Sequence, residues 1–284
     1  MAKIIQFIHP GPEHSFDNNV NGLMHKNWNS DNHRRKFCHA NGKYINVDNK
    51  NIDDEFMFWS EWEAPSFVNL TNQNSPLPKY LHLPYLPSDN NGNIIATGSQ
   101  NTDPCVFGDY FKYFVCQQIR KNGKLTQMTN LDKGDLILFG SGKNKRFLID
   151  TVFVVDETID LINVESEYKV LSIDRYNNYS VSGCKIYKGK KFVKNEIYSF
   201  VPASKNYFGR IEVPSNSTLL LNNYITNNLT QGRKVSDVNQ NTIEMVWAEL
   251  KTLAQNQGLF LAHEVKWPDK IINGQNSINK FGKC

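Results

Sequence analysis

The chain lacks the sequence features that identify membrane-spanning and zinc-binding proteins. Its 284 residues contain no apolar run near the roughly 18 residues needed to span a bilayer. Its five cysteines are odd in number, widely spaced and outside any zinc-finger spacing, which argues against a structural zinc site. Free thiols suit a reducing compartment, and the N-terminus does not resemble a signal peptide. We therefore expect a cytoplasmic protein with no membrane partner.

A strong charge imbalance is also missing. The formal net charge is +4 and the pI about 8.6, far from the values of proteins that coat nucleic acid. This charge permits an anionic partner without requiring one. The only dense basic run is Lys185–Lys194, which we interpret as a solvated β-hairpin with Gly189 at the turn. A phosphate-binding strip is the alternative.

Two motifs of well-known enzymes are absent. The GSGK segment at Gly140 fails as a Walker A phosphate loop, because Ile137 stands where that motif requires its first glycine. No serine or cysteine lies in a recognisable nucleophile context such as GxSxG, so the sequence assigns no Ser/His/Asp or Cys/His triad. It identifies no cofactor and no oligomeric state.

The patterns that are present favour an α+β protein. Strand-like runs dominate, including Lys3–Ile8, Phe56–Trp62 and a hairpin formed by Asp135–Phe139 and Arg146–Val155. We predict a mainly antiparallel sheet or partly open barrel with few helices, because βαβ alternation is absent. We expect either two parts, residues 1–160 and 161–284, or one continuous domain.

Three local predictions accompany this fold class. An amphipathic helix is expected from about Asn241 to Asn256, with Asn241 as its N-cap and its apolar face in the core. The prolines between Pro65 and Ser99 indicate a long irregular segment. Further strands are expected at Phe107–Gln118 and Tyr168–Ile173.

The densest polar cluster begins with the turn His-Pro-Gly-Pro-Glu-His, in which His9 and His14 flank Glu13. A histidine titrates near neutral pH, so this turn could provide a general base and its orienting group. Ordinary hydrogen bonding within a turn is the alternative. The spacing matches no helical metal motif such as HExxH, and we expect no metal.

His33, Arg34 and Arg35 follow as a cationic run. Arginine forks bind phosphate or carboxylate through two hydrogen bonds, so the run is a candidate anion clamp. A solvated loop or helix start remains the alternative. The nearby histidines favour the clamp.

Trp59, Glu61 and Glu63 alternate along a predicted strand, with Trp62 between them. Tryptophan can stack on a planar base while carboxylates accept hydrogen bonds from its edge or from a ribose. The two glutamates could instead form ion pairs with Arg34 and Arg35 as structural partners.

The last candidate site is the turn Asn101–Pro104, which contains Asp103 and is followed by Asp109. Such a turn could present amide and carboxylate groups to a ligand or cap its own backbone. Both interpretations remain open.

In chain order, the segments HPGPEH, HRRKF, FWSEWEAPS, NTDPCVFGD, DLILFGS and DTVFVVD resemble bacterial and phage proteins grouped as nucleotide-modification-associated domains. The resemblance spans roughly residues 4 to 156. It implies a role beside DNA modification or phage defence and supplies no catalytic residues. The GDLILF strand at 134–139 is also similar to a strand of PUA-like domains, which bind modified bases in nucleic acid.

The sequence therefore predicts a pocket for a nucleotide or a nucleic-acid base in the N-terminal half. Its expected polar or catalytic groups are His9, Glu13, His14, Glu61, Glu63 and Asp103. Its expected ligand contacts are His33, Arg34, Arg35, Trp59, Trp62, Asn101 and Asp109. The alternatives are a hydrolase that cleaves a phosphoester or glycosidic bond with His and Glu, and a non-catalytic protein-interaction module.

Overall fold

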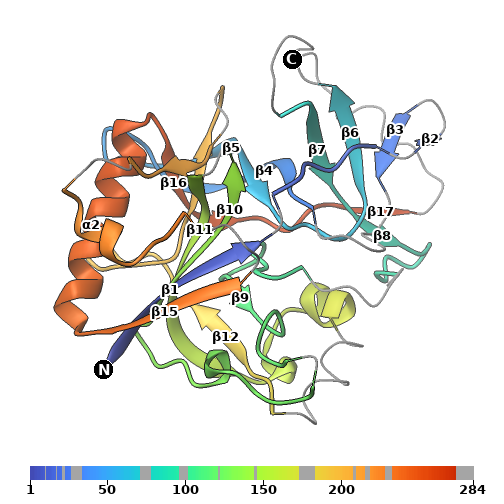
Figure 1. Cartoon of the computed structure of the whole chain (residues 1–284). Coiled ribbons are helices and arrows are strands. Elements are labelled where there is room, and N and C mark those ends of the chain that lie inside the picture. The colour runs from blue at the N-terminus through green and yellow to red at the C-terminus, as the bar shows by residue number, and fades with distance from the viewer. Residues whose placement is uncertain are drawn as a thin grey trace.

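A computed structural model of the chain places two large mixed β-sheets against each other, with one long helix packed on the first sheet (Figure 1). The described residues are 1–9, 11–16, 18–20, 23–26, 34–70, 78–95, 102–120, 122–143, 146–172, 183–206, 209–214, 218–227 and 232–272.

The first sheet has seven strands and is centred on the apolar N-terminal strand. Apolar residues fill both faces of this strand, as expected for one covered on both sides. In spatial order the strands are β15 (Gly232–Val238), β1 (Ala2–His9), β10 (Leu136–Lys143), β11 (Arg146–Ile159), β12 (Ile186–Gly189) and β9 (Lys112–Tyr113), and β14 (Ile211–Glu212) pairs with β11.

The second sheet has eight strands, and four of them close a circuit, because β16 pairs with both β13 and β4. The core of this sheet is the long β4–β5 hairpin. In spatial order the strands are β16 (Phe260–Val265), β13 (Val201–Ser204), β5 (Asn51–Ser60), β4 (Lys36–Ile45), β7 (Tyr80–Pro84), β6 (Ser66–Leu70), β3 (Leu23–Lys26) and β2 (Asn18–Val20).

The remaining elements are short, apart from one helix. A small parallel sheet joins β17 (Lys270–Ile272) to β8 (Leu86–Ser88). The helix α2 (Gln240–Asn256) buries Ile243, Val246, Trp247, Leu250 and Ala254. Residues 166–172 are helical, and 3₁₀ turns lie at Gln127–Thr129, Leu161–Asn163 and Leu220–Asn223. Within the described residues, no helix has the length and apolarity needed to span a bilayer.

The period-two alternation of the central strands divides the core into two layers. On β1, Ile5 and Phe7 face the second sheet, where they join the cluster that contains Phe56 and Phe58. Ile4 belongs to the opposite cluster, which includes the buried face of α2. The end of β1 therefore lies between the two sheets, and this is where the polar residues gather.

The structure confirms a sheet-rich α+β chain, and most strand pairings are antiparallel. Three pairings, β1–β10, β4–β7 and β17–β8, are parallel, so both large sheets are mixed. Each large sheet also combines strands from both sides of residue 160, since β15 pairs with β1 and β13 pairs with β5. A boundary at residue 160 would divide both sheets.

Several local predictions were wrong. The segment Pro65–Ser99 contains β6, β7 and β8 instead of being irregular throughout, and only Lys112–Tyr113 forms a strand within 107–118. Residues 168–172 are helical, not extended. The helix α2 is capped by Asn239, whose side chain accepts from the N–H of Thr242, and not by Asn241. Gly189 ends β12 instead of occupying a hairpin turn.

Candidate functional site

A cluster of charged side chains is buried between the two sheets, with Arg35 at its centre. Arg35 immediately precedes β4 and is only 1% exposed. Its Nη2 lies 2.9 Å from Oδ2 of Asp150, on β11, and its Nη1 lies 3.3 Å from Oε1 of Glu61, which follows β5. One guanidinium thus joins carboxylates carried by both sheets.

Arg210 forms the second cationic part of the cluster. Its Nε lies 3.1 Å from Oδ1 of Asp150, and its Nη1 donates to Oγ of Ser141 at 2.9 Å. The guanidinium carbon lies 3.9 Å from the centre of the Trp59 ring. Asp150 therefore binds two arginines at once, and Trp59 covers one face of the second.

A bulge in β11 places Asp150 in this cluster. Phe139 and Gly140 of β10 pair with Thr151 and Ile149 of β11, so Asp150 is the extra residue between them. Gly140 approaches the carbonyl of Leu148 so closely that any Cβ would collide with it. In the parallel β1–β10 pair, Ser141 lies beside His9.

His9 ends β1 with its ring between two polar partners. Its Nδ1 lies 2.8 Å from Oε1 of Glu61, and its Nε2 lies 3.6 Å from Sγ of Cys116. The aromatic rings of Phe7 and Phe139 pack against the imidazole at 4.6 and 5.7 Å between centroids. The imidazole is thus fixed in a buried position between a carboxylate and a thiol.

The other two residues of the N-terminal turn point elsewhere. Glu13 accepts from the backbone N–H groups of Lys79 and Tyr80, and burial raises its pKa. The His14 backbone donates to the Arg35 carbonyl, which fixes the backbone of Arg35. Burial, with the nearby charge of Lys36, lowers the pKa of His14 to about 2, so this ring is neutral near pH 7. The turn does not bring its three polar side chains together.

The two tryptophans have different environments. Trp59 is 4% exposed and packs against Phe37 and Arg210. Trp62 is fully buried, donates its Nε1–H to the carbonyl of Pro65 and packs edge-on against Phe107. Trp62 is therefore a core residue in this structure, and Trp59 supports Arg210 instead of presenting an open face.

The two glutamates of this region lie beyond the strand, because β5 ends at Ser60. Glu61 belongs to the buried cluster through His9 and Arg35. Glu63 is also buried, and its backbone N–H donates to Oγ1 of Thr102 at 3.0 Å. The interpretation of Glu61 as an ion-pair partner of Arg35 agrees with these distances.

Asp103 shapes the turn that carries Cys116. Its two carboxylate oxygens accept from the backbone N–H groups of Phe114 and Cys116, both at 2.8 Å. Burial raises the pKa of Asp103 well above its usual range, against the opposing effect of these hydrogen bonds. This carboxyl group caps a backbone turn 11 to 13 residues downstream, not its own.

The remaining predicted residues lie outside the cluster or outside the described residues. Arg34 is exposed although its neighbour Arg35 is buried, so the two arginines do not form one clamp. Asp109 is exposed, and its backbone N–H donates to Glu165. His33 and Asn101 lie outside the described residues.

Four members of the site were missed from the sequence: Cys116, Ser141, Asp150 and Arg210. Asp150 did carry a signal, because a lone carboxylate within the apolar strand RFLIDTVFVV needs a buried partner. Arg210 carried none, since it lies in a short segment between Gly209 and β14.

Comparisons with protein-family models, with curated proteins and with solved structures found no match to this chain. In the described part of the chain, no three His, Cys, Asp or Glu side chains are grouped so that they could hold a metal ion. The candidate site is therefore defined by its own geometry. It is a largely buried set of two arginines, two carboxylates, an imidazole and a serine hydroxyl, with the partly exposed Cys116 beside the imidazole.

Proposed function

We propose that this chain binds a nucleotide, or a base within nucleic acid, at the buried cluster around Arg35 and Arg210. One observation carries the proposal. The Nε of Arg35 and the Nη2 of Arg210 are buried and find no hydrogen-bond acceptor among the described residues. An unsatisfied buried donor costs about 1–3 kcal/mol, and more on a charged group. Phosphate oxygens are acceptors that match a guanidinium fork.

The carboxylates would bind the base or the ribose of such a ligand. Glu61 lies beside Arg35 and Glu63 is buried two residues further along the chain. A carboxylate accepts hydrogen bonds from the N–H groups of a base edge or from a ribose hydroxyl. Trp59, covered by Arg210, would act by holding that guanidinium in place.

Two further features agree with this proposal: the sequence resemblance and the free thiols. The similarity of residues 4–156 to nucleotide-modification-associated domains, with its implied role in DNA modification or phage defence, stays a prediction that points to the same class of ligand. Cys38, Cys105, Cys116 and Cys184 are free thiols, which agrees with a cytoplasmic location.

Binding is tested by calorimetric titration of the full chain with deoxynucleoside monophosphates, deoxynucleoside triphosphates and single-stranded DNA carrying plain or modified bases. Arg210→Gln should weaken binding of the best ligand by about 10- to 100-fold, because a charge-assisted hydrogen bond contributes about 1.5–3 kcal/mol. The matched control is Arg146→Gln, which removes an exposed arginine paired with Glu212.

The variants separate a specific site from general attraction to the basic chain. Equal losses in Arg210→Gln and Arg146→Gln would mean that the buried cluster is not the site. Absence of binding to every ligand in the set would favour the non-catalytic interaction module instead.

Hydrolysis of such a ligand is the second candidate function, and the contact between His9 and Glu61 favours it. A histidine held by a carboxylate at 2.8 Å is the usual arrangement of a general base. Release of inorganic phosphate or of free base, measured with the same nucleotides and oligonucleotides, tests it. Unchanged turnover in His9→Gln would remove this candidate.

A further inference from the structure

Cys116, His9 and Glu61 form a linear chain of side chains from three separate elements. The Sγ of Cys116 lies 3.6 Å from Nε2 of His9, and Nδ1 of the same ring lies 2.8 Å from Oε1 of Glu61. Cys116 follows β9, His9 ends β1, and Glu61 follows β5. A thiol, an imidazole and a carboxylate in this order are the parts of an activated nucleophile.

The charge on Glu61 favours the ring form in which Nε2 accepts the proton of the thiol. Nδ1 has two neighbours, Oε1 of Glu61 at 2.8 Å and Nη2 of Arg35 at 3.2 Å. Nη2 of Arg35 already has a closer acceptor in Asp150, at 2.9 Å. A carboxylate oxygen carries no hydrogen, so its 2.8 Å contact favours the ring form with the hydrogen on Nδ1, and in that form Nε2 is the acceptor that faces the thiol.

Cys116 differs from the other thiols that the structure describes. Cys38, Cys105 and Cys184 are buried, whereas Cys116 is partly exposed. The thiols of Cys38 and Cys105 donate to backbone carbonyls, and that of Cys116 faces an imidazole. Among the described cysteines, only Cys116 is partly exposed and has its thiol beside an imidazole.

The backbone holds Cys116 in a strained turn. Val115 and Gln117, on either side of it, have φ angles of 68° and 58°. The left-handed region is unfavourable for any non-glycine residue, and most of all for a β-branched valine. The turn persists because Asp103 accepts from the N–H groups of Phe114 and Cys116. The sulfur is thus held at a fixed position.

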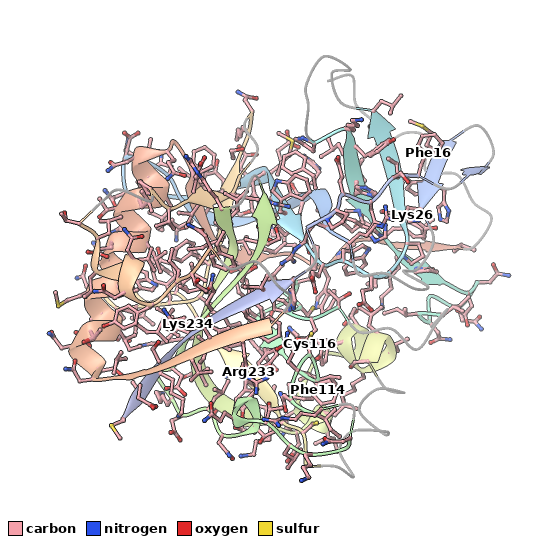
Figure 2. The ribbon with its side chains drawn as sticks, viewed as in Figure 1. Phe16, Lys26, Phe114, Cys116, Arg233 and Lys234 are labelled. Atoms are coloured by element: carbon pink, nitrogen blue, oxygen red, sulfur yellow. The ribbon has the colours of Figure 1, made fainter. Side chains whose placement is uncertain are left out.

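The turn that carries Cys116 contacts β15. Arg233, on β15, donates from Nη1 to the carbonyl of Gln117 at 3.3 Å, next to Cys116. Figure 2 shows the labelled side chains of Cys116 and Arg233 in the same region, below the end of β1. Arg233 is partly exposed, so a cation lies beside the residue that follows Cys116.

We propose that Cys116 is a catalytic nucleophile that attacks the sp² carbon of an amide or amidine, with His9 as its general base and Glu61 as the positioning residue. This chemistry does not depend on the ligand being a nucleotide. The carboxyl groups of Glu63 and Asp103 lie close enough to act on the thiol electrostatically, and they would accept N–H groups of such a substrate.

The atoms of the step balance without an oxidant or reductant. The Sγ–H proton moves to Nε2 of His9 as the sulfur bonds to the substrate carbon. The C–N bond then breaks, the leaving nitrogen takes the proton from His9, and a thioester or thioimidate remains on Cys116. Water, deprotonated by His9, attacks that carbon, and the thiolate leaves with the proton that His9 returns.

The protonation state at rest fits general-base activation. Burial, followed by the negative charges of Asp103, Glu61 and Glu63, raises the pKa of the Cys116 thiol well above its usual range. The resting sulfur is therefore a neutral thiol and not a preformed thiolate. Its reaction with an electrophile should depend on His9 to remove the proton.

The test uses p-nitrophenyl acetate, an activated acyl donor, on the full chain under native conditions. Nitrophenolate release is followed by absorbance, and the acetylated residue is mapped by peptide mass spectrometry. We expect a burst of one equivalent with the acetyl group on Cys116, no burst in Cys116→Ala, and a rate about 100-fold lower in His9→Gln. Preferential acetylation of another residue in the wild type would overturn the proposal without any variant.

Two further variants separate catalysis from structure. His39→Gln removes a partly exposed histidine that pairs with Glu55, and it should leave the burst rate unchanged. Glu61→Gln should slow the burst and move the acidic limb of its pH profile to lower pH, because the protonated ring loses its anionic partner. Equal burst rates and pH profiles in the wild type and Glu61→Gln would refute the positioning role. Absence of a burst would refute the nucleophile proposal. It would not bear on nucleotide binding, which is measured separately.

Discussion

The guanidinium of Arg210 packs over the ring of Trp59, with 3.9 Å between the guanidinium carbon and the ring centre. Arg210 comes from the C-terminal part of the chain, and Trp59 lies near the end of β5. The contact therefore holds an arginine from the C-terminal part of the chain against a tryptophan from the N-terminal part. In a desolvated setting such a contact contributes about 2 kcal/mol.

Trp59→Leu should lower the free energy of unfolding by about 3 kcal/mol, through lost packing and the lost contact with Arg210. Trp59→Phe keeps an aromatic face and should cost less. Urea denaturation followed by circular dichroism measures both. Equal stability of the leucine and phenylalanine variants would mean that the Trp59 ring stabilises the fold through its volume alone. Its attraction for the guanidinium would then contribute nothing.

Asp150 pairs with both arginines, so its charge should contribute more to the free energy of unfolding than that of any surface carboxylate. Asp150→Asn leaves Arg35 and Arg210 with one buried anionic partner fewer, and breaking a buried pair costs about 3–5 kcal/mol. The matched control lies on the same strand. Asp156→Asn removes a carboxylate paired with the exposed Lys133 and should cost less than about 1 kcal/mol. Chemical denaturation of the two variants should therefore give clearly separated midpoints.

Lys112 is a buried cation outside the cluster, and its role is structural. Its Nζ donates to the carbonyls of Phe107 and Tyr110 and lies 3.1 Å from Oε1 of Glu165. Lys112→Met should lower the free energy of unfolding by about 3 kcal/mol, because two carbonyls and a carboxylate lose their donor. Thermal melting against Lys188→Met, which removes a more exposed lysine paired with Glu157, tests this.

Periodicity and strand propensity predicted the central strands from the sequence alone. Lys3–Ile8 and Arg146–Val155 lie within β1 and β11, and Asp135–Phe139 overlaps the first half of β10, which begins at Leu136. Runs with apolar residues on both faces are typical of strands that are buried on both sides. The same propensity was misleading at residues 168–172, which are helical. At these residues, tertiary packing around Tyr168 and Leu171 outweighs the local preference for a strand.

The candidate site could be predicted only in part, for a topological reason. Proximity in the sequence placed Arg34 beside Arg35 and Glu13 beside His9. The sheets instead bring Asp150 and Arg210 to Arg35, across sequence separations that no local pattern encodes. The pairing of Cys116 with His9 depends in the same way on the turn after β9, which the sequence indicated only as part of a strand.

Two buried histidines should make stability fall in mild acid. Burial, with the charge of Lys36, lowers the pKa of His82 to about 3, and the pKa of His14 is lowered to about 2, from 6.5. A lowered folded-state pKa means that the unfolded chain binds protons first. The stabilisation is therefore complete above about pH 6.5 and is lost as pH falls toward the folded values. Each histidine contributes a slope of about 1.4 kcal/mol per pH unit within that window.

His82→Gln should remove one of these slopes, so its unfolding free energy should change less between pH 6 and pH 4 (an interval of roughly two units) than that of the wild type. The buried carboxyl groups of Asp103 and Glu13 have raised pKa values and act in the opposite direction, but they are common to both proteins. The difference between the two slopes therefore isolates His82. Parallel slopes for His82→Gln and the wild type would mean that this ring is protonated at the same pH in the folded and unfolded chains.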